Sequence, residues 1–172
     1  MFWPPLAPRN SRRRYAVNLF FDDVRVGQVF ESARHTFLRS EIVAFAQLFD
    51  PNAFHLDPAA ARALGMNDVI ASGFHTLSLS FRLFFEIHPW DDAILPSPGI
   101  DKVRFLQPVY PGDSVFVRAT VLEVLPSGSR PDRGMVRLLH ETLGATTHVP
   151  ILSAEAMHRL RRRRPVDPSI VA

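Results

Sequence analysis

The chain has 172 residues with a formal net charge of +3, and 47% of its residues are hydrophobic. This length predicts a single domain with a sizeable core. Because the chain contains no cysteine, disulfides, thiol nucleophiles and thiolate metal sites are excluded.

The positive charge is concentrated at the two ends of the chain. Four arginines lie before residue 15 and four more at 161–164, whereas residues 15–160 hold more acidic than basic residues. No aromatic residues interleave with the arginines, and no helix-turn-helix or zinc-finger spacing occurs, so we expect no nucleic-acid partner. We predict a basic arm over 1–20, one domain over 21–160 and a basic tail over 161–172.

The N-terminal sequence does not resemble a targeting signal. Residues 1–8 lack the positive start and apolar stretch of a signal peptide. No segment approaches the ~20 apolar residues of a membrane span. We therefore expect a cytoplasmic protein that does not contact membranes.

The first predicted elements are a strand and a helix. Residues 24–39 alternate between apolar and polar positions around a glycine turn, which predicts an extended entry and a first strand. Residues 40–49 have apolar positions at helical spacing, with Ser40 as the expected cap and Glu41 in the first turn. Pro51 is expected to end this helix.

Two further helices are predicted. Asp57 suits an N-cap, Pro58 the first helical position and Gly65 the C-terminal stop of a short helix. Residues 73–87 place apolar side chains on nearly every side of a helical wheel, which predicts a long buried helix.

Four strands complete the chain, over 99–109, 113–125, 134–144 and 147–160. They are separated by segments rich in Gly, Pro, Asp and Ser, which are typical of turns. Because the connections are short, successive strands are expected to pair antiparallel. The predicted fold is α+β, with a curved antiparallel sheet wrapped around the long central helix.

The first candidate site is the stretch FDPNAFHLDP, residues 49–58, which we interpret as a loop. Asp50 and His55 lie five residues apart, so chain geometry allows their side chains to meet without requiring it. Together they offer an acceptor and a group that titrates near neutrality, the pair needed to hold a water and move its proton. Asn52 is suited to bracing the loop. A purely structural Asx-rich turn is the alternative interpretation.

The second candidate is the stretch IASGFHT, residues 70–76, at the start of the buried helix. The Gly73 N–H can stabilise a carbonyl oxygen that becomes anionic, with Ser72 as N-cap. The structural alternative is that Ser72 caps, Gly73 turns and His75 packs in the core. The spacing does not match the G-x-S-x-G nucleophile elbow, and the histidines show no metal-ligand pattern, so we expect no metal site.

These segments carry a family resemblance. DPNAFH, LDPAAA, VIASGFHT and FLQPVYPGD, in this order, resemble the MaoC-like dehydratases, which include the (R)-specific enoyl-CoA hydratases of hot-dog fold. Asp50, Asn52 and His55 match the family's D-x-N-P-x-H loop, with Ala53 where the family usually has proline. In the glycine segment, Ser72 and Phe74 replace the family's usual His and Met. The likeness covers about residues 24–160.

The resemblance implies a hydratase or dehydratase of acyl-CoA thioesters, with coenzyme A as part of the substrate and no separate cofactor. Asp50 and His55 become the acid/base dyad, the Gly73 N–H the oxyanion donor and Asn52 a support for the loop. It also implies a homodimer or a dimer of dimers, which an exposed sheet edge favours independently.

Further residues are candidates for contact with the substrate: Asn52, Phe54, Ser72, Phe74, His75 and Arg104. The rings of Phe54 and Phe74 favour a short or branched acyl group. Arg104 is a candidate to meet a CoA phosphate, and an exposed strand arginine without a ligand is the alternative interpretation. Two other functions stay open, namely an acyl-CoA thioesterase on the same fold and a non-catalytic acyl-CoA-binding or partner subunit.

Overall fold

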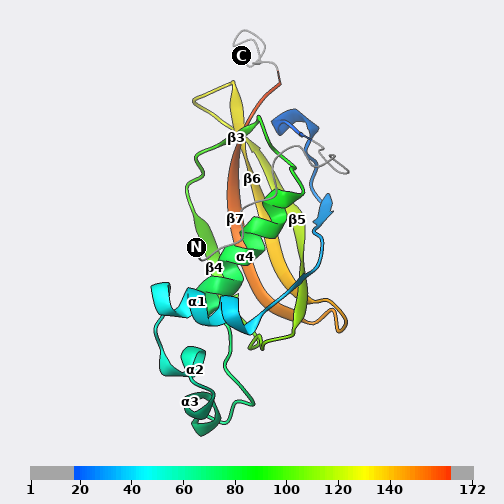
Figure 1. Ribbon diagram of the computed structural model, residues 1–172. Helices are drawn as coiled ribbons and strands as arrows, with labels where there is room; N and C mark the ends of the chain where they lie inside the picture. Colours follow the sequence, from blue (N-terminus) through cyan, green and yellow to red (C-terminus); the bar gives the residue numbers. More distant parts are fainter. Residues whose placement is uncertain (1–17, 164–172) are drawn as a thin grey trace.

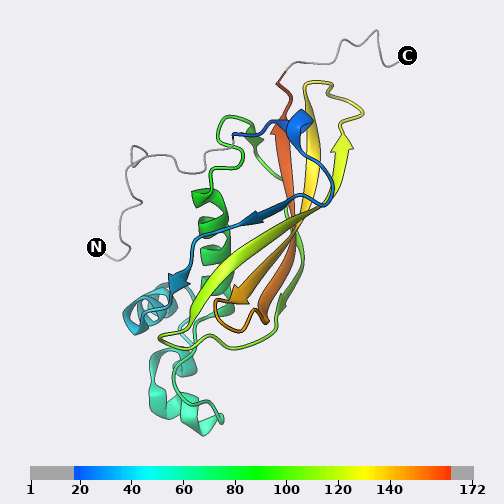
Figure 2. The ribbon, with the colours of Figure 1, turned by 90° about the vertical axis from the view of Figure 1, so that its right-hand side faces the viewer.

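The protein is built around one curved antiparallel sheet and one long helix. The structure, a computed structural model, describes residues 18–163. The strand order is β1-β5-β6-β7-β3, with β2 also pairing with β5 and β4 with β7. Figures 1 and 2 show the sheet bending around α4, which lies along its concave face. This arrangement confirms the predicted α+β architecture.

The elements follow the predicted order closely. They are η1 (Phe21–Asp23), β1 (Val29–Glu31), β2 (His35–Thr36), α1 (Arg39–Phe49), α2 (Ala53–Leu56), α3 (Pro58–Ala63), α4 (Gly73–Glu86), β3 (Ile94–Leu95), β4 (Ile100–Phe105), β5 (Ser114–Pro126), β6 (Arg133–Gly144) and β7 (Pro150–Arg161). The sequence did not predict η1, α2 or β3, each of which is four residues or shorter. Over residues 18–163, none of the helices combines the length and the hydropathy needed to span a bilayer.

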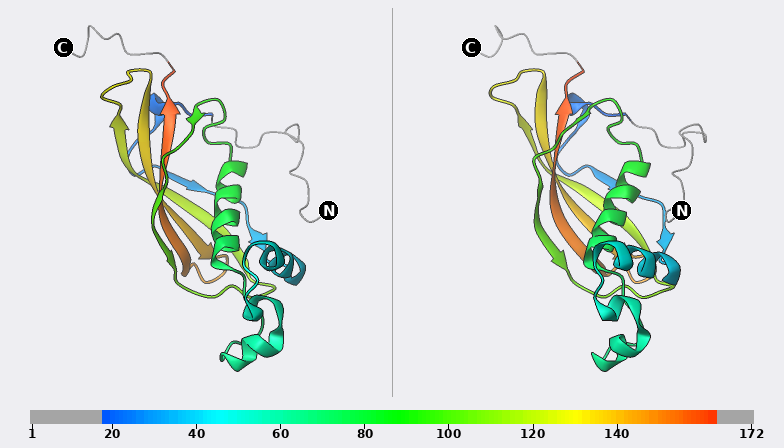
Figure 3. Two further views of the ribbon diagram at one scale, coloured as in Figure 1. Left: turned by 90° about the vertical axis from the view of Figure 1, so that its left-hand side faces the viewer. Right: turned by 60° about the vertical axis from the view of Figure 1, so that its left-hand side comes forward.

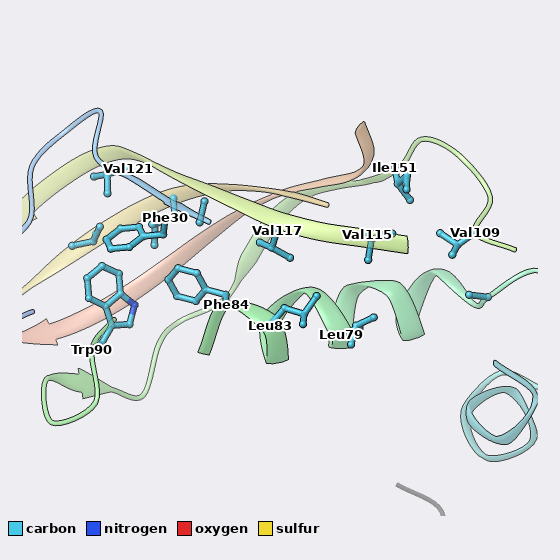
Figure 4. Close-up of a cluster of buried hydrophobic side chains, with 14 of the residues drawn as sticks. Phe30, Leu79, Leu83, Phe84, Trp90, Val109, Val115, Val117, Val121 and Ile151 are labelled. Atoms are coloured by element: carbon cyan, nitrogen blue, oxygen red, sulfur yellow. The ribbon is translucent and has the colours of Figure 1, made fainter. Parts of the chain in front are cut away.

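The core lies between α4 and the concave face of the sheet. Leu79, Leu83 and Phe84 of α4 are at most 4% exposed and meet valines of β5 (Figure 4). Trp90 extends this core beyond the end of α4, with its ring 5.2 Å from that of Phe30 in an edge-on arrangement. Burial of such side chains contributes about 1.5–3 kcal/mol each.

The prediction that α4 is buried on all sides is wrong for the single chain. Phe74 is 60% exposed and Phe85 is 40% exposed. The sheet covers only one side of the helix, so the apolar residues on the other side remain at the surface (Figure 3).

The expectation that successive strands pair is wrong for β4 and β5. Instead β4 pairs with β7, and β5 pairs with β6, β1 and β2. The chain between β4 and β5 passes the start of α4, where the Val109 carbonyl accepts from the Ala71 N–H at 2.8 Å. It then reaches β2, where the Gly112 N–H donates to the Phe37 carbonyl at 2.8 Å. This crossing segment forms one wall of the site described below.

Two of the three predicted helix caps are confirmed. Asp57 accepts from the Ala59 N–H at 2.8 Å, and Ser72 accepts from the Phe74 N–H at 3.1 Å. The prediction for Ser40 is wrong, because α1 begins one residue earlier and Ser40 lies within the helix. Instead, the Glu41 carboxylate accepts a hydrogen bond from the Leu38 N–H at 3.1 Å, so this backbone donor at the start of the helix is paired.

Part of the expected basic tail belongs to the folded domain. Arg162 pairs with Asp22 at 2.7 Å and Arg163 pairs with Asp23 at 2.9 Å. The Arg162 guanidinium also lies over the Phe21 ring, 4.9 Å from its centroid. The other terminal arginines outside β7, at positions 9, 12, 13, 14 and 164, lie outside the described residues.

Candidate active site

A short helix brings Asp50 and His55 together. The stretch interpreted as a loop contains the one-turn helix α2, in which the His55 N–H donates to the Asn52 carbonyl at 3.0 Å. This turn places His55 Nε2 3.3 Å from Asp50 Oδ2. The chain doubles back between α1 and α3, near one end of the sheet (Figure 3).

The hydrogen bonding of His55 fixes the roles of its two ring nitrogens. The residue is 4% exposed, and its Nδ1 lies 2.7 Å from the Ile70 carbonyl oxygen. Because a carbonyl only accepts, Nδ1 carries the proton. In the neutral ring Nε2 therefore presents its lone pair toward Asp50, so it can accept a proton at this position.

Both oxygens of Asp50 are held by donors. Asn52 Nδ2 donates to Oδ1 at 2.5 Å, and Ser72 Oγ donates to Oδ2 at 2.7 Å. The two bonds hold the carboxylate in one orientation. Asp50 and His55 thus form a contacting pair in which the orientation of each member is fixed by a neighbour.

Gly73, whose N–H begins α4, lines the same cleft as Asp50 and His55. Within residues 18–163, no group accepts a hydrogen bond from this N–H. At the N-terminus of a 14-residue helix, such an amide carries part of the positive end of the helix dipole. Asp50, His55 and Gly73 all line one cavity of about 490 Å³.

The remaining walls of the cavity are mainly apolar. They comprise Phe54, Met66, Ile70, Ala71, Phe74, Thr76, Phe105, Leu106, Gln107, Pro108, Val109 and Ile151. The Phe105 ring packs against Gly73 so closely that a Cβ at this glycine would lie 2.8 Å from the ring. A polar dyad at one point of an apolar cleft is typical of a small-molecule site.

Four predicted site residues do not line the cleft, namely Asn52, Ser72, His75 and Arg104. Asn52 is exposed and donates to Asp50 instead. Ser72 is fully buried and directs its hydroxyl to Asp50. His75 is also fully buried, stacked on Phe45 with ring centroids 4.7 Å apart, and burial lowers its pKa to about 4. Arg104 is exposed on β4 and donates to the Val103 carbonyl at 2.9 Å.

Phe105 and the crossing segment were not predicted as parts of the site. Residues 105–109 have the pattern of a strand end. They belong to a segment that carries the family resemblance, but no local pattern predicts that they contact Gly73. Among the described residues, no group of three or more His, Cys, Asp or Glu side chains is arranged to hold a metal ion.

Comparisons with known proteins identify the family and the fold of this chain. Residues 22–141 match the family described as MaoC like domain. A MaoC-like dehydratase from Rhodospirillum rubrum is 37% identical, with a TM-score of 0.79 over 85% of this chain and 99% of that chain. The R-hydratase PhaJ1 from Pseudomonas aeruginosa is 26% identical, with a TM-score of 0.69 over 85% of this chain and 88% of that chain. Protein YdeM of Bacillus subtilis, described as uncharacterized, is 34% identical over 121 residues, 70% of this chain and 84% of its own. The structural similarities confirm the predicted hot-dog fold.

Proposed function

The chain belongs to the MaoC-like dehydratase family, and from this premise we propose that it hydrates a 2,3-enoyl-CoA or dehydrates the corresponding 3-hydroxyacyl-CoA. The observation that carries the proposal is the convergence of Asp50, His55 and an unoccupied Gly73 amide on one apolar cleft. Coenzyme A enters as part of the substrate, and the dyad provides the acid and the base without a cofactor.

The dyad takes one proton from water and later gives one proton to the substrate. In hydration, a water held between Asp50 and His55 gives a proton to the dyad while its oxygen bonds to C3 of the enoyl group. The pair of electrons from the double bond moves to the thioester oxygen as an enolate. The dyad then returns a proton to C2, so that one water is added and both residues regain their starting state.

The Gly73 amide stabilises the enolate. Charge on the thioester oxygen appears only as the C3–O bond forms, so a donor aimed at this oxygen lowers the barrier. One such donor is typically worth about 3–4 kcal/mol in the transition state. The amide is prealigned because Gly73 is the first residue of α4.

The aromatic walls favour a short or branched acyl group. Phe54 lies next to His55, with ring centroids 4.3 Å apart, and the Phe74 and Phe105 rings meet edge-on at 6.3 Å. All three phenylalanine rings line the cleft that also contains the dyad and Gly73, so an acyl group bound there must lie against them.

The test is turnover of a panel of trans-2-enoyl-CoA esters that differ in length and branching. We expect loss of the absorbance of the conjugated thioester, fastest for short or branched esters. Release of free thiol from saturated acyl-CoA esters would instead identify a thioesterase. Tight binding of the esters without turnover would identify a non-catalytic subunit, and both results contradict the proposal.

Replacing Gly73 tests the amide. In Gly73→Ala the new Cβ meets the Phe105 ring, so either the ring or the first turn of α4 must shift. We expect kcat to fall about 100-fold, because small displacements of a positioned group are costly. Gly128→Ala is the matched control, since its Cβ meets nothing within 4 Å. Phe105→Ala combined with Gly73→Ala should recover part of the loss, whereas full activity of Gly73→Ala alone would contradict the placement.

We further propose a homodimer. Within residues 18–163 the edge strand β4 pairs with β7 alone and exposes Ile100 and Phe105. Helix α4 exposes Phe74, which lines the cleft, and Phe85 further along the helix. A second copy would cover this apolar surface and the unpaired strand edge. Light scattering should give twice the mass of the chain, and a monomer at micromolar concentration would contradict the proposal.

A further inference from the structure

We propose that Ser72 is a positioning residue that couples the first turn of α4 to the Asp50 carboxylate and so sets the geometry of the dyad. The inference rests on the proposed hydratase function and adds to it a residue that does not touch the substrate. Ser72 is fully buried and does not line the cleft.

The hydroxyl of Ser72 can point in one direction only. Its oxygen already accepts from the Phe74 N–H at 3.1 Å, as the N-cap of α4. Its single proton is then directed to Asp50 Oδ2 at 2.7 Å. The bonds therefore form a chain from the helix N–H through the hydroxyl to the carboxylate, and such chains polarise one another.

Oδ2 is also the oxygen that faces the imidazole. His55 Nε2 lies 3.3 Å from Oδ2, so the atom held by Ser72 is the one that shares a proton or a water with His55. The other oxygen is held by Asn52, which is an exposed residue. A buried bond to a charged group resists competition from water better than an exposed one, so Ser72 is the principal anchor.

The link joins segments that are far apart in the sequence. Asp50 follows α1, whereas Ser72 begins the helix that presents the Gly73 amide. The same serine therefore sets the position of the carboxylate and lies next to the oxyanion donor. This placement fixes the distance between the acid/base pair and the amide, on which proton transfer at C2 and charge stabilisation at the thioester both depend.

The kinetic test uses Ser72→Gly and Ser72→Thr. Glycine is nearly as good an N-cap as serine, so Ser72→Gly retains the start of α4 while removing the hydroxyl bond. We expect kcat to fall by about 10- to 100-fold, the equivalent of one hydrogen bond to a charged group, with KM changed less than twofold. Ser72→Thr keeps the hydroxyl and should restore most of kcat. Wild-type kcat in Ser72→Gly would overturn the proposal while leaving the hydratase function intact.

A second measurement does not depend on activity. The thermal midpoints of Ser72→Gly, Asp50→Ala and the double variant form a cycle, and the double variant should lose less than the sum of the two single losses. The matched cycle of Ser72→Gly with Asp57→Ala, which removes the cap of α3, should be additive. Additive losses in the first cycle would overturn the link. Absence of enoyl-CoA turnover by the wild type would overturn the proposed function, and the thermal cycle would still decide on the link.

Discussion

Asp50→Asn and His55→Ala are each expected to lower kcat/KM for a small enoyl-CoA by about 100- to 10,000-fold. Asparagine keeps the shape of the Asp50 side chain and can still accept from Ser72, but it cannot take up a proton at neutral pH. His55→Ala removes the ring nitrogen that faces Oδ2 and leaves the Ile70 carbonyl without its donor. Initial rates measured as loss of the conjugated thioester absorbance give the result directly.

Asp57→Asn is the matched control for both variants. Asp57 lies in the same stretch and caps α3 through the Ala59 N–H, a role that asparagine fills equally well. This variant removes a carboxylate two residues from His55 and should retain wild-type turnover. Circular dichroism should show all three variants folded. Unchanged turnover in both dyad variants would rule out this pair as the source of acid and base.

The stability of the fold is expected to fall steeply as the pH drops from about 6.5 to 4. His75, His140 and His158 are buried, and burial lowers their pKa values to about 4, about 3 and about 4. In the unfolded chain they titrate near 6.5. Between these values the unfolded state binds protons that the folded state does not, so the free energy of unfolding decreases as the pH falls.

The magnitude is large for a domain of this size. Three such histidines together contribute a slope of roughly 4 kcal/mol per pH unit within the window, against a typical total stability of about 5–15 kcal/mol. The contribution is fully present above pH 6.5, where the rings are neutral in both states. Denaturant titrations at intervals from pH 7.5 to 5 measure the slope.

His140 offers the sharpest single variant. Its ring lies nearly parallel to those of Phe81, 4.8 Å away, and His158, 5.6 Å away, and neither of its nitrogens has a hydrogen-bond partner among residues 18–163. His140→Leu should reduce the slope by about one third. His148→Asn removes an exposed histidine at a left-handed position and should leave the slope unchanged. Equal slopes for wild type and His140→Leu would contradict the assignment.

The sequence predicted the regular elements better than the contacts between them. Apolar periodicity located α1, α4 and the long strands, and the residues Asp57 and Ser72 indicated the caps of α3 and α4. The pairing of β4 with β7 was missed because proximity in sequence favours β5, whereas the crossing segment is held by hydrogen bonds to Ala71 and Phe37. Those bonds link residues far apart in the chain and leave no local pattern.

In the site, too, the sequence predicted the residue types better than the contacts between them. The types and spacing of Asp50, His55 and Gly73 indicated acid/base chemistry beside an amide donor. The turn that brings the first two together is a four-residue helix, which is too short to show a periodicity. The hydrogen bond from Ser72 to Asp50 joins residues 22 positions apart. It forms because the fold brings the start of α4 beside the end of α1, which no local sequence pattern predicts. Phe105, at the end of β4, was missed for the same reason, because its contact with Gly73 joins residues far apart in the sequence.

The ion pairs that join Arg162 and Arg163 to Asp22 and Asp23 bring the beginning and the end of the domain to one place. A chain that leaves the fold where it entered can be duplicated in a gene, or joined to another module, with only a short connector. Two such domains fused in tandem would then lie side by side instead of end to end. The positions of Asp22 and Asp23 thus affect how this domain can be fused to other domains during evolution, independently of its catalytic chemistry.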